Sequence, residues 1–386
     1  MLRLPADFTS PVLEHAPQSW TRVESVEVGF VEVCGPHTTG VVIRERFDTA
    51  PSPDSDAQRS GRTGSELKDA AIANEVPFIK DLETDRLPLL TGEPEHDGRY
   101  AETALARAVS LPLTADMLED NQRRERLVRE AIRVQVNAAK TFPPYFAFKS
   151  LDDQWLTVNL LCIDTARLLA PLTAMSAWIS VPLSALRDGT LLTAIPLYAR
   201  RLARGAEIVI TVGEFNHKLG LDDIAAYFDV LAACVDHGLR PLPDRIDELS
   251  VPAAALFAVG SILGTSRYRT AGDPYVFKTE KRRTPLVKYH VARQGLKLRV
   301  VLARKRRGRK SIPPCADRDC AALKPGNANP HRTLRLHNAH DVRNEIARAR
   351  ALGARAYVNG LQNNRYAFLR KIGQAIVVAN ARREAA

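Results

Sequence analysis

The sequence predicts an α/β fold, a (β/α)8 TIM-like barrel with a small zinc-binding subdomain near the C-terminus. Apolar strand-like runs alternate with helical patterns of about 12 to 18 residues, which is typical of repeated βαβ units and a parallel sheet. Seven or eight such strands can be counted from Val76 onward, and this number favours a closed barrel over an open doubly wound sheet. No G-x-G-x-x-G sequence follows a strand and no Walker sequence is present, so the nucleotide-binding folds lose their main support.

Composition divides the chain into four parts. We expect residues 1–47 to supply N-terminal strands of the barrel, 67–300 to form the rest of it, and 301–386 to hold a basic segment, the zinc-binding subdomain and C-terminal helices. Residues 48–66 consist of proline, serine, glycine and charged residues without periodicity, which predicts a disordered insertion.

Strands are the first elements that the pattern predicts. Residues 24–45 alternate apolar and polar side chains and are rich in valine, which indicates strands joined by a Gly-Pro turn. A short apolar strand at 76–79 ends in a polar segment that contains Asp81 and Asp85. Because α/β enzymes place their chemistry just past the C-terminal ends of strands, both are candidate catalytic residues. The alternative is that they are ordinary charges of a solvated loop.

The middle of the chain alternates regularly between the two kinds of element. The predicted helices cover 114–139 (with Thr114 as N-cap), 164–175, 190–205 and 221–238. The predicted strands cover 145–148, 155–163, 177–183 and 207–213. Asp244 ends the next strand and Asp273 follows the last one, so both join the candidate carboxylates. A hairpin-like pair of strands and a helix that starts near Asp341 complete the pattern.

Charge and composition limit the class of protein. The chain has 386 residues, 45% of them hydrophobic, and contains no apolar run of the roughly 18 to 20 residues that a membrane span requires. Its N-terminus does not resemble a signal peptide, and its five cysteines do not indicate a disulfide framework, so we expect a cytoplasmic protein with no membrane partner.

A net charge of +11 favours a polyanionic partner, and nucleic acid is the first candidate. The alternative is a basic composition without functional meaning. One basic run is dense enough to predict contacts with phosphates, and its cations are Arg304, Lys305, Arg306, Arg307, Arg309 and Lys310.

A partial metal motif follows this run. Cys315 and Cys320 lie in a polar turn that begins with prolines, and His337 precedes an expected helix. Thiolate and imidazole ligands at short spacing suit tetrahedral Zn2+. The fourth ligand stays open among three candidates, which are Asp317, His331 and His340.

The segment resembles the zinc site of the tRNA-guanine transglycosylase superfamily, a C-x-C-x-x-C sequence followed by a histidine within a Leu/Ile-His-Asn triplet. Cys315 and Cys320 match its first and third cysteines, Asp317 stands at the middle position, and His337 lies in Leu-His-Asn. The resemblance implies a barrel with a structural zinc subdomain that exchanges guanine for a 7-deazaguanine-type base in tRNA or DNA. The Cys320–His337 spacing is shorter than this family's.

A second match concerns the base-recognition loop of that family, which ends in Val-Gly-Glu. Gly213 and Glu214 stand at these positions and are implied to bind the base, although Gly213 also fits a tight βα turn. The chain departs from the family at the strand-end nucleophile, where serine and threonine replace the aspartate, and at the N-terminal aspartate motif. The carboxylates left for nucleophilic and proton-transfer roles are Asp81, Asp85, Asp244 and Asp273.

Three hypotheses therefore follow from the sequence. The first is a divergent transglycosylase-like enzyme that exchanges or modifies a guanine-type base in nucleic acid. The second is a catalytically altered relative that binds nucleic acid as a subunit of a modification or defence system. The third is a small-molecule barrel enzyme unrelated to nucleic acid. The oligomeric state is not predicted.

Overall fold

The protein is described here by a computed structural model. It describes residues 16–23, 28–45, 66–93, 97, 100–101, 103–216, 218–263, 271, 273–275, 288–289, 296–297 and 330–385. The basic run at 304–310 and the turn that holds Cys315, Asp317 and Cys320 lie outside these residues, as does almost all of the expected insertion at 48–66.

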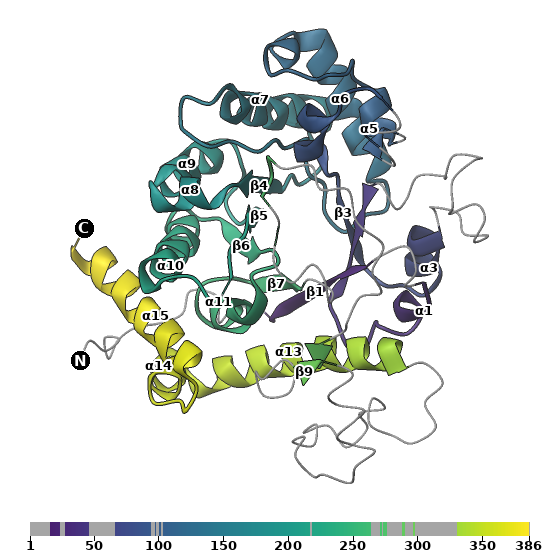
Figure 1. The fold of residues 1–386 in the computed structure, drawn as a ribbon. Coiled ribbons are helices and arrows are strands. Elements are labelled where there is room, and N and C mark those ends of the chain that lie inside the picture. The colour runs from purple at the N-terminus through teal and green to yellow at the C-terminus, as the bar shows by residue number, and fades with distance from the viewer. Residues whose placement is uncertain are drawn as a thin grey trace.

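Parallel strands form the centre of the molecule (Figure 1). One sheet has the order β3-β2-β1-β7 and a second has the order β4-β5-β6, and every pairing within them is parallel. The strands are β1 (Gln18–Val23), β2 (Gly40–Arg44), β3 (Phe78–Asp81), β4 (Ala177–Val181), β5 (Glu207–Val212), β6 (Arg240–Pro243) and β7 (Gly260–Leu263). The predicted α/β fold with parallel sheets is thereby confirmed.

Hydrogen bonds link the two sheets at both ends. Between β6 and β7, Asp244 and Ile262 form an isolated parallel bridge. On the other side, the segment 139–148 lies between β3 and β4: Ala139 N donates to Phe78 O at 2.7 Å, and Thr141 forms a parallel bridge with Met175. The strands and this segment thus follow one another around a ring in chain order.

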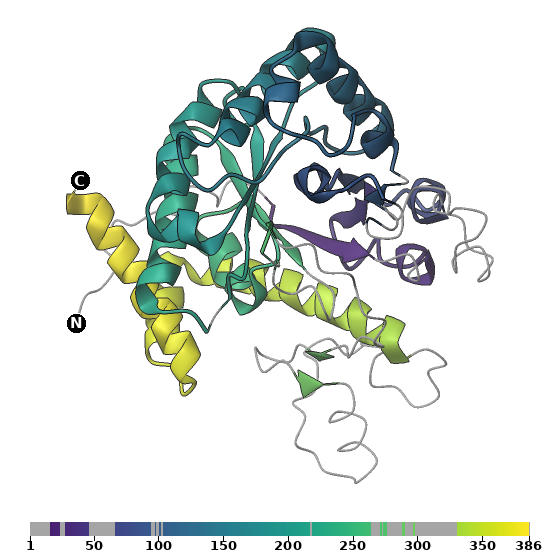
Figure 2. The same cartoon turned by 45° about the horizontal axis from the view of Figure 1, so that its top comes forward.

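Helices surround the ring, and each lies between two successive strands in the chain (Figure 1). They are α1 (Val28–Val31), α3 (Glu66–Ala73), α6 (Asn121–Val134), α7 (Gln154–Leu169), α8 (Leu183–Arg187), α9 (Thr190–Ala199), α10 (Leu221–Asp236) and α11 (Ser250–Leu256). After β7, α13 (Pro330–Leu352) packs against α11, β1 and α1 and so occupies the remaining place beside the first strand. Figures 1 and 2 show α15 (Ala367–Ala385) beside α10, against which it packs, and α14 (Ala354–Gln362) packs against α13 and α15.

Shorter elements connect the main ones. These are η2 (Thr84–Leu89), α5 (Ala104–Arg107), η4 (Asp116–Leu118), η5 (Asp247–Leu249), and the antiparallel pair β8 (Lys288–Tyr289) and β9 (Leu296–Lys297). The pair β8–β9 confirms the expected hairpin-like strands. Within the described residues, no helix is long and apolar enough to cross a membrane.

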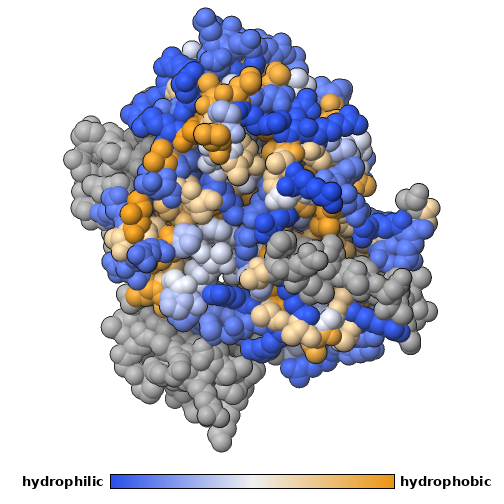
Figure 3. All heavy atoms as spheres, turned by 180° about the vertical axis from the view of Figure 1, so that it is seen from behind, coloured by the Kyte–Doolittle hydropathy of each residue, from blue (hydrophilic) through white to orange (hydrophobic). Residues whose placement is uncertain are grey.

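The strands are buried on both faces because one face lines the ring and the other meets the helices. Trp20, Val42 and Ile79 belong to the main core cluster, whereas Val41 and Phe78 pack with α1 and α3 in a second cluster. Close approach of β1 and β7 requires glycine at 260, where a Cβ would lie 2.1 Å from Gln18 O. Large hydrophobic side chains left exposed are scattered, and on the face in Figure 3 hydrophobic patches alternate with hydrophilic ones.

Several predicted boundaries differ from the structure. The expected strand at 155–163 is the first part of α7, which begins after its N-cap Asp153 and ends at Leu169. The expected helix at 114–139 begins after Asp120, whose side chain accepts from Arg123 N, and not after Thr114. The strands expected within 24–45 are separate elements, since β1 ends at Val23 and α1 precedes β2.

Candidate functional site

Three charged side chains from the C-terminal ends of distant strands meet inside the ring. Arg22 of β1 donates from Nε and Nη2 to the two carboxylate oxygens of Asp244, at 3.0 and 2.9 Å. Its Nη1 donates to Asp81 Oδ2 at 2.5 Å. The side chains are 2%, 0% and 5% exposed respectively, so the ion pairs are almost fully shielded from water. The strands that carry them are far apart in sequence, and only the ring brings them together.

The remaining acceptor positions of these carboxylates are also occupied. Asp81 Oδ1 accepts from the hydroxyl of Tyr145 and from Glu83 N. Asp244 Oδ2 accepts from Thr211 Oγ1 at 2.8 Å. Trp178 supports the network, because its ring stacks on Tyr145 and lies 5.3 Å from the Arg22 guanidinium carbon. Every polar group of this cluster that we describe is therefore fixed by a neighbour, as buried charges require.

Burial raises the pKa of Asp81 and of Asp244, but the positive charges of Arg22 and Arg245 outweigh this effect and hold both pKa values below the ordinary range. Both groups are therefore carboxylates at all ordinary pH values. Neither is placed to attack a substrate, since their oxygens are already bound.

Asp85 has the opposite character. It lies on η2, four residues after Asp81, and is only partly buried. Its Oδ2 accepts from Ser180 Oγ of β4 at 2.9 Å. Burial raises the pKa of Asp85; the charge of Arg86 opposes this rise, and the negative charge of Asp81 adds to it. Asp85 thus holds its proton to higher pH than an ordinary aspartate does.

Backbone strain marks the same end of the ring. Glu83, Glu214 and Arg245 have positive φ values of 51°, 58° and 54°. Each lies two residues after the end of a strand, namely β3, β5 and β6. Residues other than glycine and asparagine rarely adopt a positive φ. Those that do cluster at active sites and ligand-binding sites. The C-terminal ends of the strands are therefore the best-supported location for function.

The other predicted residues have more ordinary surroundings. Gly213 N donates to Val181 O at 2.8 Å, which fits a βα turn, and Glu214 is exposed with its N donating to Ala271 O. Asp273 accepts from Tyr275 N at 2.9 Å and so closes its own turn, while its carbonyl accepts from Arg86 at 3.5 Å. The structure thus brings Asp81, Asp85 and Asp244 together, with Asp273 at the edge.

Sequence reasoning missed Arg22, Tyr145 and Arg245. Arg22 could have been suspected, because it is a charged residue within a buried strand and lies on the same face as Gln18 and Trp20. Tyr145 lies in a segment predicted as a strand, but nothing near it indicates a partner.

The predicted zinc site stays a prediction. Cys315, Asp317 and Cys320 lie outside the described residues, as does the side chain of His331. His337 is buried in the interior of α13, so the expectation that it stands at the mouth of a helix is wrong. Within the part of the chain that the structure describes, no group of three or more His, Cys, Asp or Glu residues could hold a metal ion.

His340, another candidate ligand, has neighbours of its own. Its Nδ1 lies 3.4 Å from His37 Nδ1, and its Nε2 lies 2.8 Å from Asn344 Nδ2. The three free cysteines of the described residues, Cys34, Cys162 and Cys234, are buried and burial raises their pKa values. They are therefore thiols packed in the core.

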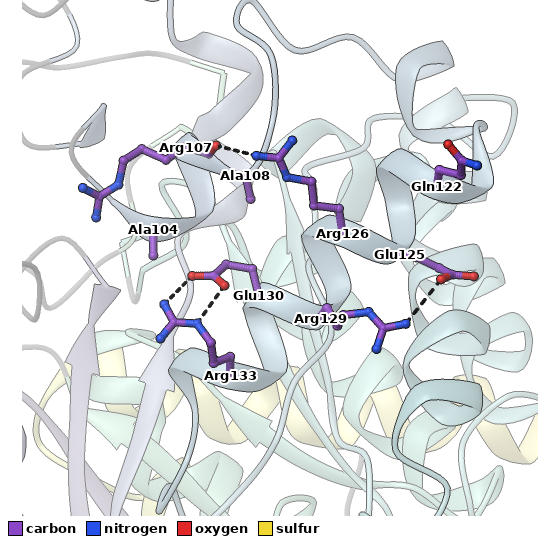
Figure 4. A pocket seen from close by; sticks show the side chains of 9 residues that line it. All are labelled: Ala104, Arg107, Ala108, Gln122, Glu125, Arg126, Arg129, Glu130 and Arg133. Atoms are coloured by element: carbon purple, nitrogen blue, oxygen red, sulfur yellow. Dashed lines mark hydrogen bonds and ion pairs between the residues drawn. The ribbon is translucent and has the colours of Figure 1, made fainter.

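A cavity of about 870 Å³ lies away from this cluster, between α5 and α6 (Figure 4). Its charged side chains include two ion pairs along α6, Arg129–Glu125 at 3.5 Å and Arg133–Glu130 at 2.5 Å. Arg126 reaches across to α5 and donates to the carbonyl of Arg107 at 3.5 Å. None of the predicted catalytic residues lines the cavity.

The chain has only distant structural similarity to known proteins. No family model matches the chain, and no curated protein matches it. An endo-1,4-beta-xylanase from Caldicellulosiruptor owensensis has a TM-score of 0.42 at 10% identity, over 69% of this chain and 93% of that one. A GH10 xylanase from Thermobacillus composti has a TM-score of 0.37 at 10% identity, over 73% and 76%. With TM-scores below 0.5, these likenesses carry no argument about this chain's fold or activity.

The transglycosylase resemblance is nevertheless wrong. Neither a family model nor a curated protein of that superfamily matches the chain. The expected base exchange and the nucleic-acid partner, tRNA or DNA, are corrected with it. The site agrees physically: Asp244, one expected nucleophile, is fully buried and bound by Arg22 and Thr211.

Proposed function

We propose that this chain is a closed (β/α)8 barrel enzyme that acts on a small molecule, with Asp85 as the proton donor at the C-terminal ends of the strands. One observation carries this proposal: Asp81 is bound by Arg22, whereas Asp85, four residues further on, is bonded to the hydroxyl of Ser180, and the pKa values of the two groups are shifted in opposite directions. Carboxyl groups whose environments separate their pKa values are the usual basis of acid and base roles in one site.

Each group has a distinct part in this proposal. Asp85 is partly exposed and bonded to a neutral hydroxyl, so it can give up its proton to a leaving group. Asp81 does not react; its fixed negative charge keeps the proton on Asp85. Arg22 holds Asp81 ionised and in place, so it is a positioning residue. Hydrolysis of a carbon–oxygen bond, as in glycosides and esters, is the chemistry that needs such a donor: water attacks the carbon, the bond to the leaving oxygen breaks, and that oxygen takes the proton of Asp85.

Ionisation of Asp85 tests the proposal directly. Carbon-13 NMR of labelled aspartate, recorded between about pH 3 and 8, should show a carboxyl that titrates above the ordinary value near 3.9. This resonance should be missing from Asp85→Asn and present in Asp164→Asn, which changes an exposed carboxylate paired with Arg201. An Asp85 carboxyl that titrates at the ordinary value would sink the proposal.

Leaving-group dependence provides the functional test. Glycosides and esters should be tried in pairs, one member with an alkyl leaving group that needs a proton and one with a nitrophenyl group that does not. On alkyl substrates Asp85→Asn should lose about 10²–10⁴-fold in kcat, with a much smaller loss on nitrophenyl substrates. Equal losses on both members, or an unchanged rate, would show that Asp85 is not the donor.

A further inference from the structure

Arg245 is the most unusual residue at this end of the ring. It follows β6 and its side chain is 14% exposed. Its Nε donates to Asp244 Oδ2 at 2.9 Å. Within the described part of the chain, no acceptor takes a hydrogen bond from its two terminal nitrogens, Nη1 and Nη2. Neither nitrogen is among the fully buried polar atoms that have no partner, so both reach the surface, where a ligand can meet them.

Arg245 shares its bonded carboxylate with a second arginine. Its bonded carboxylate, Asp244, is already bound by both Nε and Nη2 of Arg22. Burial lowers the pKa of Arg245, and the charges of Arg22 and Arg44 lower it further. Among the described residues, Asp244 is the carboxylate that Arg245 binds, and it shares this carboxylate with Arg22.

The backbone at Arg245 is strained as well. Its φ of 54° is one that an arginine adopts at a cost and an asparagine or glycine adopts readily. An arginine that is strained, largely buried and incompletely bonded contributes little to stability in this form. Its bonding would be completed by an anion that enters from the exposed side.

We propose that Arg245 binds an oxyanion group, a carboxylate or a phosphate, of the small molecule on which the enzyme acts. This rests on the proposed function for the location of the substrate, whereas the binding itself does not depend on proton donation. The planar guanidinium fork can give two parallel hydrogen bonds to two oxygens of either group. The positive charge of Arg245 would favour an anion over a neutral ligand.

Calorimetric titration of the whole protein at low ionic strength tests this, with inorganic phosphate in one series and malonate in the other. The informative variant is Arg245→Asn, because asparagine suits the positive φ and leaves Asp244 with Arg22 and Thr211. The matched control is Arg187→Asn, which removes an exposed arginine paired with Asp223 on the outer helices. Arg245→Lys keeps the charge but not the fork.

We expect one-to-one binding of at least one anion by the wild type and by Arg187→Asn. Affinity should fall about 10-fold or more in Arg245→Asn, with an intermediate loss in Arg245→Lys. Binding of phosphate alone identifies a phosphate substrate, and binding of malonate alone identifies a carboxylate. No binding to the wild type, or equal affinity in wild type and Arg245→Asn, overturns the proposal. A normal titration of Asp85 alongside anion binding would remove only the proton-donor proposal.

Discussion

Arginine–carboxylate pairs occur in two regions of this molecule, and their surroundings differ completely. Inside the ring, Arg22 joins Asp81 and Asp244 with all three side chains at most 5% exposed. Along α6, Arg129–Glu125 and Arg133–Glu130 line the α5–α6 cavity, with the arginine side chains 67% and 66% exposed (Figure 4). The distances in the two regions overlap, so geometry alone would suggest interactions of similar value.

Burial decides what each pair does. Water screens the pairs on α6, and each long side chain loses conformational freedom when it is held, so such pairs contribute little. In the ring, the charges lose their hydration when the chain folds and interact with each other instead. Removal of one partner therefore leaves a charge with no water to solvate it. The buried cluster is therefore cooperative, and it shifts the pKa of Asp85 nearby, which an exposed pair cannot do.

The largest expected effect follows from Arg22→Met. This substitution keeps most of the side-chain volume but leaves Asp81 and Asp244 with a reduced set of donors in the interior. The free energy of unfolding should fall by about 3–5 kcal/mol, as for other broken buried ion pairs. Urea unfolding at neutral pH measures it. A loss below about 1 kcal/mol, the range of exposed pairs, would show that the two regions are alike.

A smaller effect of opposite sign is expected for Asp85→Asn. The folded pKa of Asp85 is raised, so its contribution to stability is fully present below the unfolded value of about 3.9 and is lost as pH rises through the folded value. An asparagine carries no such penalty and its oxygen can still accept from Ser180. The variant should therefore be more stable than the wild type at pH 7 and equal to it near pH 3.

Urea unfolding of both proteins across this pH range gives the difference. Asp164→Asn provides the comparison, because it removes an exposed carboxylate that is paired with Arg201. A gain for Asp85→Asn that is the same at every pH would mean that packing, and not the proton, explains it.

Parts of this structure could be predicted from sequence where the hydrophobic pattern extends over a long continuous segment. The strand at 207–213 and the helix at 221–238 were predicted nearly to the residue, as β5 and α10, because their apolar patterns are continuous or strongly periodic. The helix α7 was mistaken for a strand over 155–163. It is buried on several sides, so seven of the nine residues from 155 to 163 are apolar and the period of 3.6 is obscured. Only the N-cap Asp153 indicated a helix.

The sequence predicted the carboxylates of the site but not the arginine that joins them. Asp81, Asp85 and Asp244 were found because a carboxylate at the end of a strand is visible in the sequence. Arg22, which joins two of them, was not, since its contacts span 59 and 222 residues. Strand order around a ring determines such contacts, and one sequence does not contain that order. The transglycosylase resemblance failed for a related reason, because short cysteine and Leu-His-Asn matches do not report that His337 lies within a long helix.

The smallest expected effect tests the exposed side of the comparison. Arg133→Met removes a pair with Glu130 whose distance of 2.5 Å equals that between Arg22 and Asp81. The hydrogen bonds from Arg133 lower the pKa of Glu130, yet the arginine is surrounded by water and salt screens the attraction. The free energy of unfolding should change by less than about 1 kcal/mol, and the change should shrink further at high salt. Urea unfolding at low and high salt measures both. A loss that matched Arg22→Met and resisted salt would mean that the α5–α6 cavity holds its charges away from water, and that pair distance, not burial, governs both regions.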